Sequence, residues 1–321
     1  MCIRDRFGAD GLVVAGMNDS DLKRGFIPIL IEELVQQRSH ELVEATSSQL
    51  NEVGFKTQAT PRKINLFYLR DQIRERIVFD EGVYKVLNTD YKFNETELIA
   101  EVNQHPEHFS PNVVMRPLYQ EKTFPNLAYI GGGGELAYWL ERKSQFDHFK
   151  INYPMLIRRN SVLWLDQGMS KKIDKLNLNI TDIFVETESL IKTFLTKVSE
   201  EPLDLKPEKK ELESIFNSIA ERIKMIDPTL EATVKAEGAK QIKSLANLEG
   251  RLMRAEKQKH DVAINQIRTI KDKLFFNNGL QERRENFLSF YVKYGPSFFD
   301  TLKKELNPLD KRFVVIKDSP S

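Results

Sequence analysis

A run of four glycines, Gly131 to Gly134, lies between an apolar segment and an amphipathic one in LAYIGGGGELAYWLERK. The run is not a P-loop, because no Gly-Lys-Ser/Thr follows, and Leu136 replaces the third glycine of the dinucleotide fingerprint. A strand, a glycine turn and a helix start together form an anion-binding arrangement. We therefore expect Gly131, Gly132, Gly133 and Gly134 to meet a ligand, although close packing of helix on strand would also require glycine.

Glu135, in the first turn of the expected helix, narrows the chemistry of that ligand. A carboxylate there interacts favourably with the helix dipole, but it would repel a phosphate held at the same place. We therefore expect backbone N–H groups of the turn to hold a substrate carboxylate while Glu135 faces an amine. An amino acid or an amino sugar would satisfy both groups.

Three arginines and one serine are further candidates for substrate binding. Arg158 and Arg159 precede Ser161 in a strand-like segment, and Arg116 stands directly before a proline. A guanidinium can hold a carboxylate or a phosphate through two hydrogen bonds. Neighbouring side chains on a strand point to opposite faces, so only one of the adjacent arginines faces any one pocket. Solvated arginines near a strand end are the alternative.

The stretch LFFNNGLQERREN near the C-terminal end has the composition of a nucleotide site. Asn277-Asn278-Gly279 is suited to ending a long helix, and a dense polar set follows it. If this segment returns to the α/β part of the chain, aromatic faces and amides there would suit an adenine ring. The nucleotide-binding candidates are Tyr138, Trp139, Phe276, Asn278, Gln281 and Arg283. An exposed, charged helix start is the alternative.

His105 and His108 enclose Pro106-Glu107, a sequence pattern that resembles a zinc-binding motif. The motif is one residue short of the HxxEH pattern and contains a proline, so we expect a helix-capping or loop role and no metal site.

The only cysteine, Cys2, lies in MCIRDR, and we interpret residues 1–6 as an artefact outside the fold. No catalytic base or nucleophile is assigned, so the catalytic residues are unknown.

The bulk composition excludes several classes of protein. The chain has 321 residues, 40% of them hydrophobic and 30% charged, with a net charge of +1, so no basic surface for nucleic acid is indicated. No apolar run approaches the roughly 18–20 residues that cross a bilayer, and no secretory signal is present. We therefore expect a cytoplasmic protein with neither nucleic-acid nor membrane partners.

The elements that must position these residues fall into two halves. Residues 7–165 alternate strand-like segments (GLVVAG, NLFYL, RERIVF, LAYI and LIRRNSVLWL) with helices, of which Ser39 to Val53 is one. Residues 166–285 form a helical, coiled-coil domain. We expect residues 286–321 to pack back on the first half. The fold class is therefore α/β, a partial Rossmann-like core with inserted segments, followed by a long coiled coil.

A single long helix is expected after Asp227-Pro228. No proline occurs between Pro228 and Phe275, so this helix would be of the order of 70 Å long. Its apolar residues alternate at spacings of three and four and continue after a one-residue slip; they are Leu245, Leu248, Leu252, Ala255, Val262, Ile267, Ile270 and Leu274. Such a seam needs a partner, and we expect both Glu208 to Ile226 folded back on it and a second chain.

Several stretches, in this order, resemble the family of the bacillithiol biosynthesis cysteine-adding enzyme. They are PRKINLFYLRDQIRERI, VVMRPLYQEKTFPNLAYIGGGGELAYWLERK, DPTL, RLMRAEKQK, LFFNNGLQERREN and NPLDKRFVVI. The resemblance runs from Gly11 to the end of the chain. It implies a cytoplasmic ligase that joins L-cysteine to the amine of glucosaminyl-malate. It also implies a Rossmann-like core, a coiled coil that mediates homodimerisation, and a nucleotide site for ATP or ADP.

The resemblance also implies that family members extend further at the N-terminus, so the chain looks like a fragment. We expect it to dimerise without completing the reaction. Glucosaminyl-malate offers two carboxylates and an amine, in agreement with the arginines, the glycine turn and Glu135. Amide formation needs activation, either by ATP or in an activated cysteine. The alternatives are a non-catalytic coiled-coil scaffold with a vestigial nucleotide-binding-like α/β head and, more weakly, a regulatory nucleotide-binding module.

Overall fold

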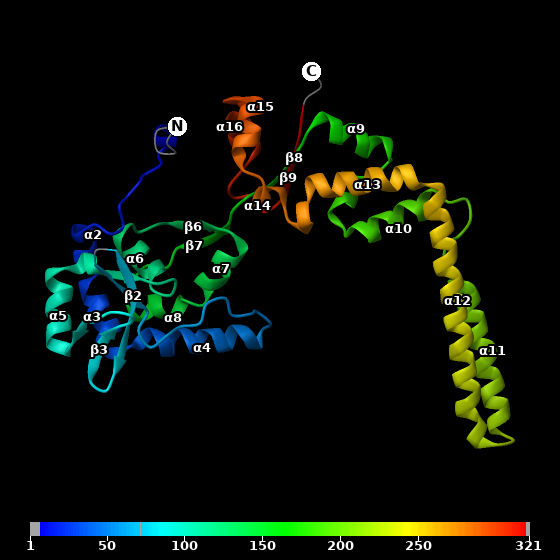
Figure 1. The fold of residues 1–321 in the computed structure, drawn as a ribbon, viewed down its shortest axis with the longest axis horizontal. Helices are drawn as coiled ribbons and strands as arrows, with labels where there is room; N and C mark the ends of the chain where they lie inside the picture. Colours follow the sequence, from blue (N-terminus) through cyan, green and yellow to red (C-terminus); the bar gives the residue numbers. More distant parts are fainter. Residues whose placement is uncertain (1–6, 71, 319–321) are drawn as a thin grey trace. The chain divides into compact units, whose positions relative to one another are not determined.

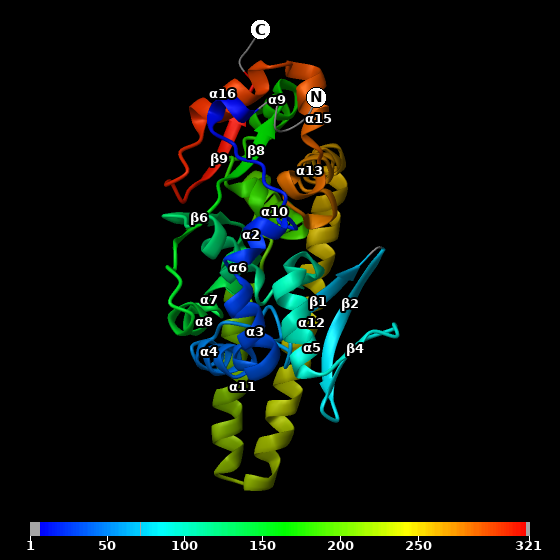
Figure 2. The ribbon, with the colours of Figure 1, turned by 90° about the vertical axis from the view of Figure 1, so that its left-hand side faces the viewer.

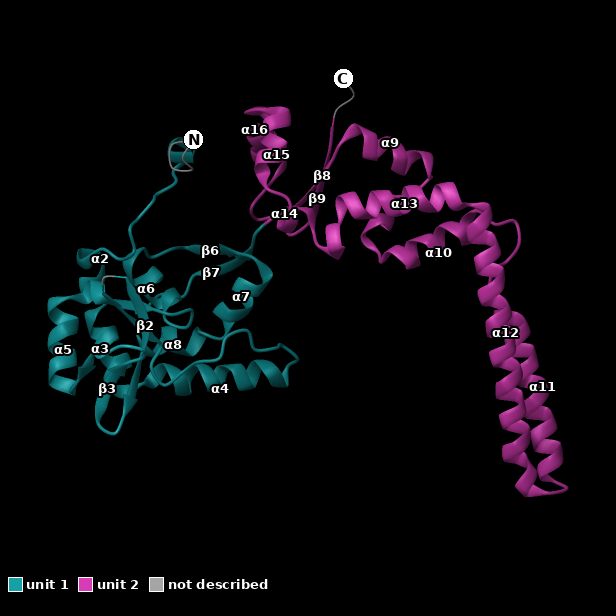
Figure 3. Cartoon of the chain, viewed as in Figure 1, with its two compact units in different colours: residues 1–159 teal, residues 160–321 magenta. Residues whose placement is uncertain are grey.

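The computed structural model describes residues 7–70 and 72–318, so the N-terminal hexapeptide lies outside the described residues. The chain divides into two compact units, residues 1–159 and residues 160–321 (Figure 3). The division falls six residues before the expected boundary at 165/166, because Ser161–Leu165 pairs with a strand of the second unit. Among the described helices, none combines the length and the apolar character needed to cross a bilayer.

The first unit mixes helices with short strands (Figure 1). Its helical elements are η1 (Gly8–Asp10), α2 (Ser20–Arg24), α3 (Ile27–Gln36), α4 (Arg38–Glu52), α5 (Glu95–Gln104), η2 (Pro106–His108), α6 (Arg116–Thr123), α7 (Gly133–Leu140) and α8 (Lys143–His148). Its strands are β1 (Leu66–Arg70), β2 (Ile73–Asp80), β3 (Val83–Val86), β4 (Lys92–Phe93), β5 (Phe109–Pro111), β6 (Ala128–Gly131) and β7 (Met155–Arg158).

Two sheets organise these strands. An antiparallel sheet has the order β4-β3-β2-β1-β5, and β6 pairs with β7 in parallel, with Gly131 opposite Arg158. The predictions of strands at NLFYL and RERIVF and of a helix over Ser39 to Val53 are confirmed. The prediction of a strand at GLVVAG is wrong. Val13 and Val14 are 77% and 64% exposed, and no described strand pairs with this segment, so its apolar run has no ladder to join.

The core of the first unit joins α3 and α5 to the antiparallel sheet and to α7 and α8. Leu30, Tyr68, Leu98, Trp139 and Phe146 are all fully buried members of this cluster. Helix α5 begins at a capping box, in which Asn94 and Glu97 each satisfy the other's backbone N–H. This cap fixes the start of α5, and His105 lies at the other end of the same helix.

The second unit is mainly helical. Its elements are β8 (Ser161–Leu165), α9 (Gln167–Lys175), η3 (Asp182–Phe184), α10 (Thr187–Val198), α11 (Lys206–Lys224), η4 (Pro228–Leu230), α12 (Glu231–Lys259), α13 (Asp261–Leu274), η5 (Phe276–Asn278), α14 (Gln281–Arg284), α15 (Phe287–Tyr294), α16 (Ser297–Glu305) and β9 (Phe313–Lys317).

Helices α11 and α12 form an antiparallel hairpin, and Figures 1 and 2 show them side by side. The prediction that residues 208–226 fold back on the long helix is therefore confirmed. A single helix to Phe275 is wrong, because His260 (φ −109°, ψ 24°) ends α12 and α13 then packs against α10. Leu245 is half-buried, but Leu248 and Leu252 are exposed, so the intramolecular seam uses only part of the predicted stripe.

The C-terminal segment packs within the second unit. Strand β9 runs parallel to β8, and Trp164, Phe298 and Ile316 form a small buried cluster. Residues 161–165, which were expected in the first half, are the strand partner of this segment, and the division of the chain assigns them to the second unit. That residues 286–321 also pack on the rest of the first half stays a prediction.

Candidate functional site

The glycine run connects β6 to α7, and its members have different surroundings. A Cβ built on Gly131 would lie 2.7 Å from Cε1 of Tyr129, whereas one on Gly133 or Gly134 would meet nothing within 4 Å. Gly131 is buried, and the other two are exposed. The first glycine is thus required by close packing, while the later two leave open the start of a helix whose first N–H groups have no intrahelical acceptor.

Glu135 caps its own helix. Its Oε2 accepts a hydrogen bond of 2.7 Å from the N–H of Gly132. This contact corrects two expectations: the amide of Gly132 is not open to a ligand, and one Glu135 oxygen is already engaged with the backbone instead of an amine. The open amides are those at Gly133 and Gly134.

Arg116 contacts helix α7. Its guanidinium donates to the hydroxyl of Tyr138 on α7 and to Oε1 of Gln120, the latter at 3.4 Å. Both partners are neutral, and the guanidinium takes part in no ion pair among the described residues. Burial raises the pKa of Tyr129 on β6, with the neighbouring Tyr138 adding to the effect, so this phenol stays uncharged. Arg116 therefore brings a positive charge to a cluster of tyrosines, with the carboxylate of Glu135 close enough to act on Tyr129.

Trp139 does not face a ligand. Its side chain is fully buried, and its indole stacks on Tyr129 with ring centroids 4.0 Å apart. The prediction that this ring borders an adenine pocket is corrected, because Trp139 occupies the inward face of α7 and forms part of the core. Tyr138, the neighbouring residue, is half-exposed.

The arginines and the serine belong to different units. Arg158 lies opposite Gly131 in the β6–β7 ladder, and the backbone N–H of Arg159 donates to the carbonyl of Gly131 at 2.9 Å. Both arginines therefore flank the glycine turn. Ser161 belongs to the second unit, where its hydroxyl lies 3.4 Å from Oε1 of Glu282. That Ser161 binds substrate together with the glycine turn stays a prediction, because the two belong to different units.

The polar set after α13 has a structural role. The side-chain amide of Gln281 accepts from the N–H of Trp164 at 2.8 Å and donates to its carbonyl at 3.2 Å. Glu282 accepts from the N–H of Val162 at 3.0 Å. Gln281 and Glu282 thus provide hydrogen-bond partners for backbone groups on the edge of β8 that does not pair with β9. The polar atoms of Gln281 are therefore not open to a nucleotide, a correction to its expected role.

The remaining nucleotide candidates lie near the end of α13. Phe276 is 59% exposed, Asn278 adopts a left-handed conformation (φ 57°), and Arg283 is an exposed partner of Glu282. That these residues border one pocket with Tyr138 stays a prediction, because the two sets belong to different units.

Two cavities of about 260 and 250 Å³ adjoin the same segment within the second unit. Trp164 and Phe290 line both, and Lys293 and Tyr294 line the first. The sequence reasoning missed these residues. The aromatic residues of FLSFYVKY were a signal in the sequence for an aromatic-lined cavity. Nothing in the sequence indicated that β8 would pair with β9, so nothing indicated that Trp164 would lie beside this run.

Another cavity of the first unit, of about 760 Å³, lies where α5 ends near β1 and β2. Its lining includes His105, Glu107, His108 and Glu101. His105 is indeed the C-terminal cap of α5, but the metal-free, purely capping interpretation missed a clustered set of ionisable groups. The spacing of Glu101 and His105, four residues apart on one helix face, was the available signal.

Hydrogen bonds hold this cluster in place. Although burial opposes ionisation, hydrogen bonds from Tyr68 and His108 keep the pKa of Glu101 below its ordinary value. Burial lowers the pKa of Lys23 to about 8, against the opposing effect of Glu107. The Lys23 ammonium donates to the backbone carbonyls of Glu107 and Phe109 at 3.1 and 2.7 Å, so it fastens this turn to α2.

Two family models match the chain. One, for the N-terminal Rossmann-like domain of the bacillithiol biosynthesis protein BshC, matches residues 1–160, and the other, for its C-terminal coiled-coil domain, matches residues 162–318. The junction between the matches coincides with the division between the two units.

Curated relatives give the same result. The chain is 45% identical over 310 residues to "Putative cysteine ligase BshC" of Flavobacterium johnsoniae, covering 97% of this chain and 58% of that protein. It is 41% identical to the protein of the same name from Christiangramia forsetii, with the same coverage. One from Bacillus cereus is 29% identical, covering 98% of this chain and 60% of the relative. The chain thus spans about three-fifths of the length of these relatives.

Proposed function

Since this chain belongs to the BshC family of bacillithiol biosynthesis proteins, we propose that it takes part in ligating L-cysteine to the amine of glucosaminyl-malate. The curated relatives carry the name of a cysteine ligase. The substrate pair follows from the family resemblance of the sequence motifs. It agrees with a first unit that offers groups for binding carboxylates.

One observation carries the assignment of the substrate site: the exposed guanidinium of Arg116 donates a hydrogen bond to the hydroxyl of Tyr138 on α7, the same helix whose start at Gly133 and Gly134 is exposed. A carboxylate of glucosaminyl-malate would receive hydrogen bonds from Arg116 and from the amides at Gly133 and Gly134. Arg158 and Arg159 flank this turn and are the candidates for the second carboxylate.

Calorimetric titration of the chain with glucosaminyl-malate tests this site. Arg116→Ala is expected to weaken binding about 10- to 100-fold, because a hydrogen bond to a charged group contributes roughly 1.5–3 kcal/mol. Arg116→Lys should retain the charge but lose the two-point geometry, giving an intermediate affinity.

Arg38→Ala is the matched control, because Arg38 is an exposed arginine of the same unit that pairs with Glu41. Its affinity for glucosaminyl-malate should equal that of the unmodified chain. Equal affinity in Arg116→Ala would refute the proposed site. If neither glucosaminyl-malate, L-cysteine nor ATP binds while the chain still dimerises, the coiled-coil scaffold becomes the better description.

Three further features belong to the proposal. Amide formation from a free carboxylate requires activation, so the reaction uses ATP or an activated cysteine, with ATP or ADP as the nucleotide. The α11–α12 hairpin, which leaves Leu248 and Leu252 exposed, is the proposed homodimer surface. The cytoplasm, which supplies such metabolites, is the proposed location.

A further inference from the structure

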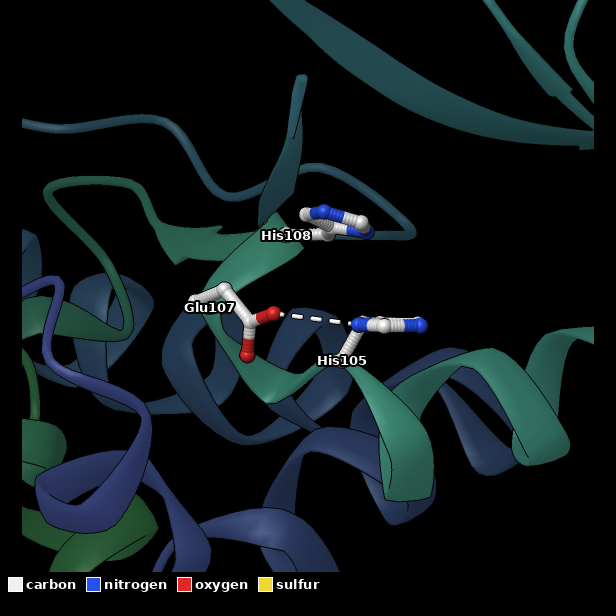
Figure 4. Close-up of side chains that lie close together, drawn as sticks. All are labelled: His105, Glu107 and His108. Carbon is white, nitrogen blue, oxygen red and sulfur yellow. Dashed lines mark hydrogen bonds and ion pairs between the residues drawn. The ribbon is translucent and has the colours of Figure 1, made fainter. Parts of the chain in front are cut away.

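The cluster at the end of α5 places two imidazoles and a carboxylate around one point. Figure 4 shows the rings of His105 and His108 stacked one above the other, with Glu107 beside them. The ring centroids are 4.9 Å apart. One ring nitrogen of each histidine and one carboxylate oxygen of Glu107 all lie within 4.8 Å of one another.

Hydrogen bonds set the orientation of His108. Its Nδ1 lies 2.7 Å from Oε1 of Glu101, and the same oxygen accepts a 2.7 Å hydrogen bond from the hydroxyl of Tyr68. An ionised carboxylate can only accept, so Nδ1 of His108 donates in this contact and Nε2 is the nitrogen left to face an ion. A carboxylate that fixes an imidazole through one nitrogen and leaves the other for an ion is the usual outer shell of a metal-bound histidine.

His105 and Glu107 form the other side of the cluster. Nδ1 of His105 lies 3.1 Å from Oε1 of Glu107. That separation suits a hydrogen bond, and it also suits two neighbouring ligands of one ion, which are roughly 3.3 Å apart when each is about 2.0–2.1 Å from tetrahedral zinc. The three ligand atoms lie within 4.8 Å of one another, so side-chain rotation would have to bring some of them closer to complete that arrangement.

We propose that His105, His108 and Glu107 bind one divalent transition-metal ion of the zinc class, with Glu101 as the positioning residue behind His108. Imidazole donors favour zinc over magnesium or calcium, which prefer oxygen ligands. Three protein ligands beside an open cavity leave one coordination position for an exogenous ligand. The cavity also contains Arg70 and Arg74, so an anion is the class of ligand that this position would take.

Calorimetry with zinc chloride tests the site, using chelator-treated protein in a Cys2→Ser background so that no thiol competes. One ion per chain is expected. His105→Ala and His108→Ala should each weaken zinc binding at least 10-fold. Glu101→Gln should weaken it about 10- to 100-fold while leaving the ligands in place, the effect typical of an outer-shell partner.

His40→Ala and His148→Ala are the matched controls, because each histidine lies in the same unit and contacts one glutamate. Both should bind zinc as the unmodified chain does. The absence of zinc binding, or unchanged binding in His105→Ala and His108→Ala, would overturn the proposal.

A second measurement covers variants that fail to fold. Cobalt(II) added to the folded protein should give visible absorption bands of a nitrogen- and oxygen-ligated, low-coordinate ion. Glu107→Gln, which preserves the shape of the side chain, should reduce those bands. Bands of equal intensity in Glu107→Gln would remove Glu107 from the site, and a spectrum identical to that of free cobalt would overturn the proposal.

Discussion

Gly131 and Gly133 are two residues apart, yet only the first is constrained by its neighbours. The space where a Cβ of Gly131 would lie is occupied by Tyr129, whose ring is itself held in a stack with Trp139. At Gly133 the same space is open. At the scale of single residues, the run therefore combines a packing requirement with an accessible helix start.

Alanine substitutions at these two positions should have opposite effects on stability. Gly131→Ala is expected to lower the free energy of unfolding by about 1–3 kcal/mol, because the added methyl group forces the stacked rings apart. Gly133→Ala should be neutral or stabilise by up to about 1 kcal/mol, since it restricts the unfolded chain without a clash. Denaturant unfolding of both variants measures the difference, and equal values would contradict this account of the turn.

At the scale of elements, a buried carboxylate joins α3 to the start of β1. Oε1 of Glu33 accepts hydrogen bonds of 2.9 Å from both the backbone and the side-chain N–H groups of Asn65. Glu33 is fully buried, and burial raises its pKa above the ordinary 4.5, although the hydrogen bonds oppose this shift. The contact fixes the approach of the helix to the sheet.

This raised pKa predicts a pH dependence of stability. Between pH 4.5 and the higher folded-state pKa, the native protein binds more protons at Glu33 than the unfolded chain does. The stabilisation is therefore complete below pH 4.5 and is lost as the pH rises through the folded-state pKa. In Glu33→Gln this decline should disappear from denaturant unfolding curves measured across the acidic to neutral range.

Glu41→Gln provides the comparison, because the Glu41 side chain is 74% exposed on the neighbouring helix α4. Its unfolding free energy should follow the same pH profile as that of the unmodified chain. A decline of the same size in Glu33→Gln and Glu41→Gln would show that Glu33 does not control the pH response.

At the scale of the whole molecule, the α11–α12 hairpin buries one stripe and exposes another. Gly238 allows the two helices to approach closely, since a Cβ there would lie 2.9 Å from Phe216. Leu248 and Leu252, one turn apart on α12, remain 46% and 43% exposed. Exposed leucines repeated along one helix favour a helical partner. This surface is the part of the predicted seam that the chain does not cover itself.

A charge on this stripe should separate the proposed dimer. Leu248→Glu is expected to shift the mass measured by light scattering from two chains towards one, because the glutamate would be desolvated in the interface. Asn247→Glu adds the same charge to the adjacent, exposed residue about 100° around the helix and should leave the mass unchanged. Circular dichroism checks that both variants remain helical. An unmodified chain that is already monomeric would exclude the dimer.

The sequence alone determined the elements whose signals are local. Apolar periodicity located β1, β2 and α4, the proline at 228 located the start of the long helical segment, and the ordered motifs identified the family. These signals can be read from the sequence because helix and strand periodicities are properties of consecutive residues. The same reasoning placed Arg116 and the glycine turn among the candidates.

Tertiary structure decided what depends on partners distant in sequence. The pairing of β8 with β9 placed β8 in the second unit, and packing buried Trp139 in the core. The side chain of Gln281 hydrogen-bonds to the backbone at the edge of β8. The tertiary structure also brought Glu101 and Tyr68 to His108, which no local pattern contains. Burial and hydrogen bonding depend on which surfaces meet, and that is settled only when the free energy of the whole chain selects one packing.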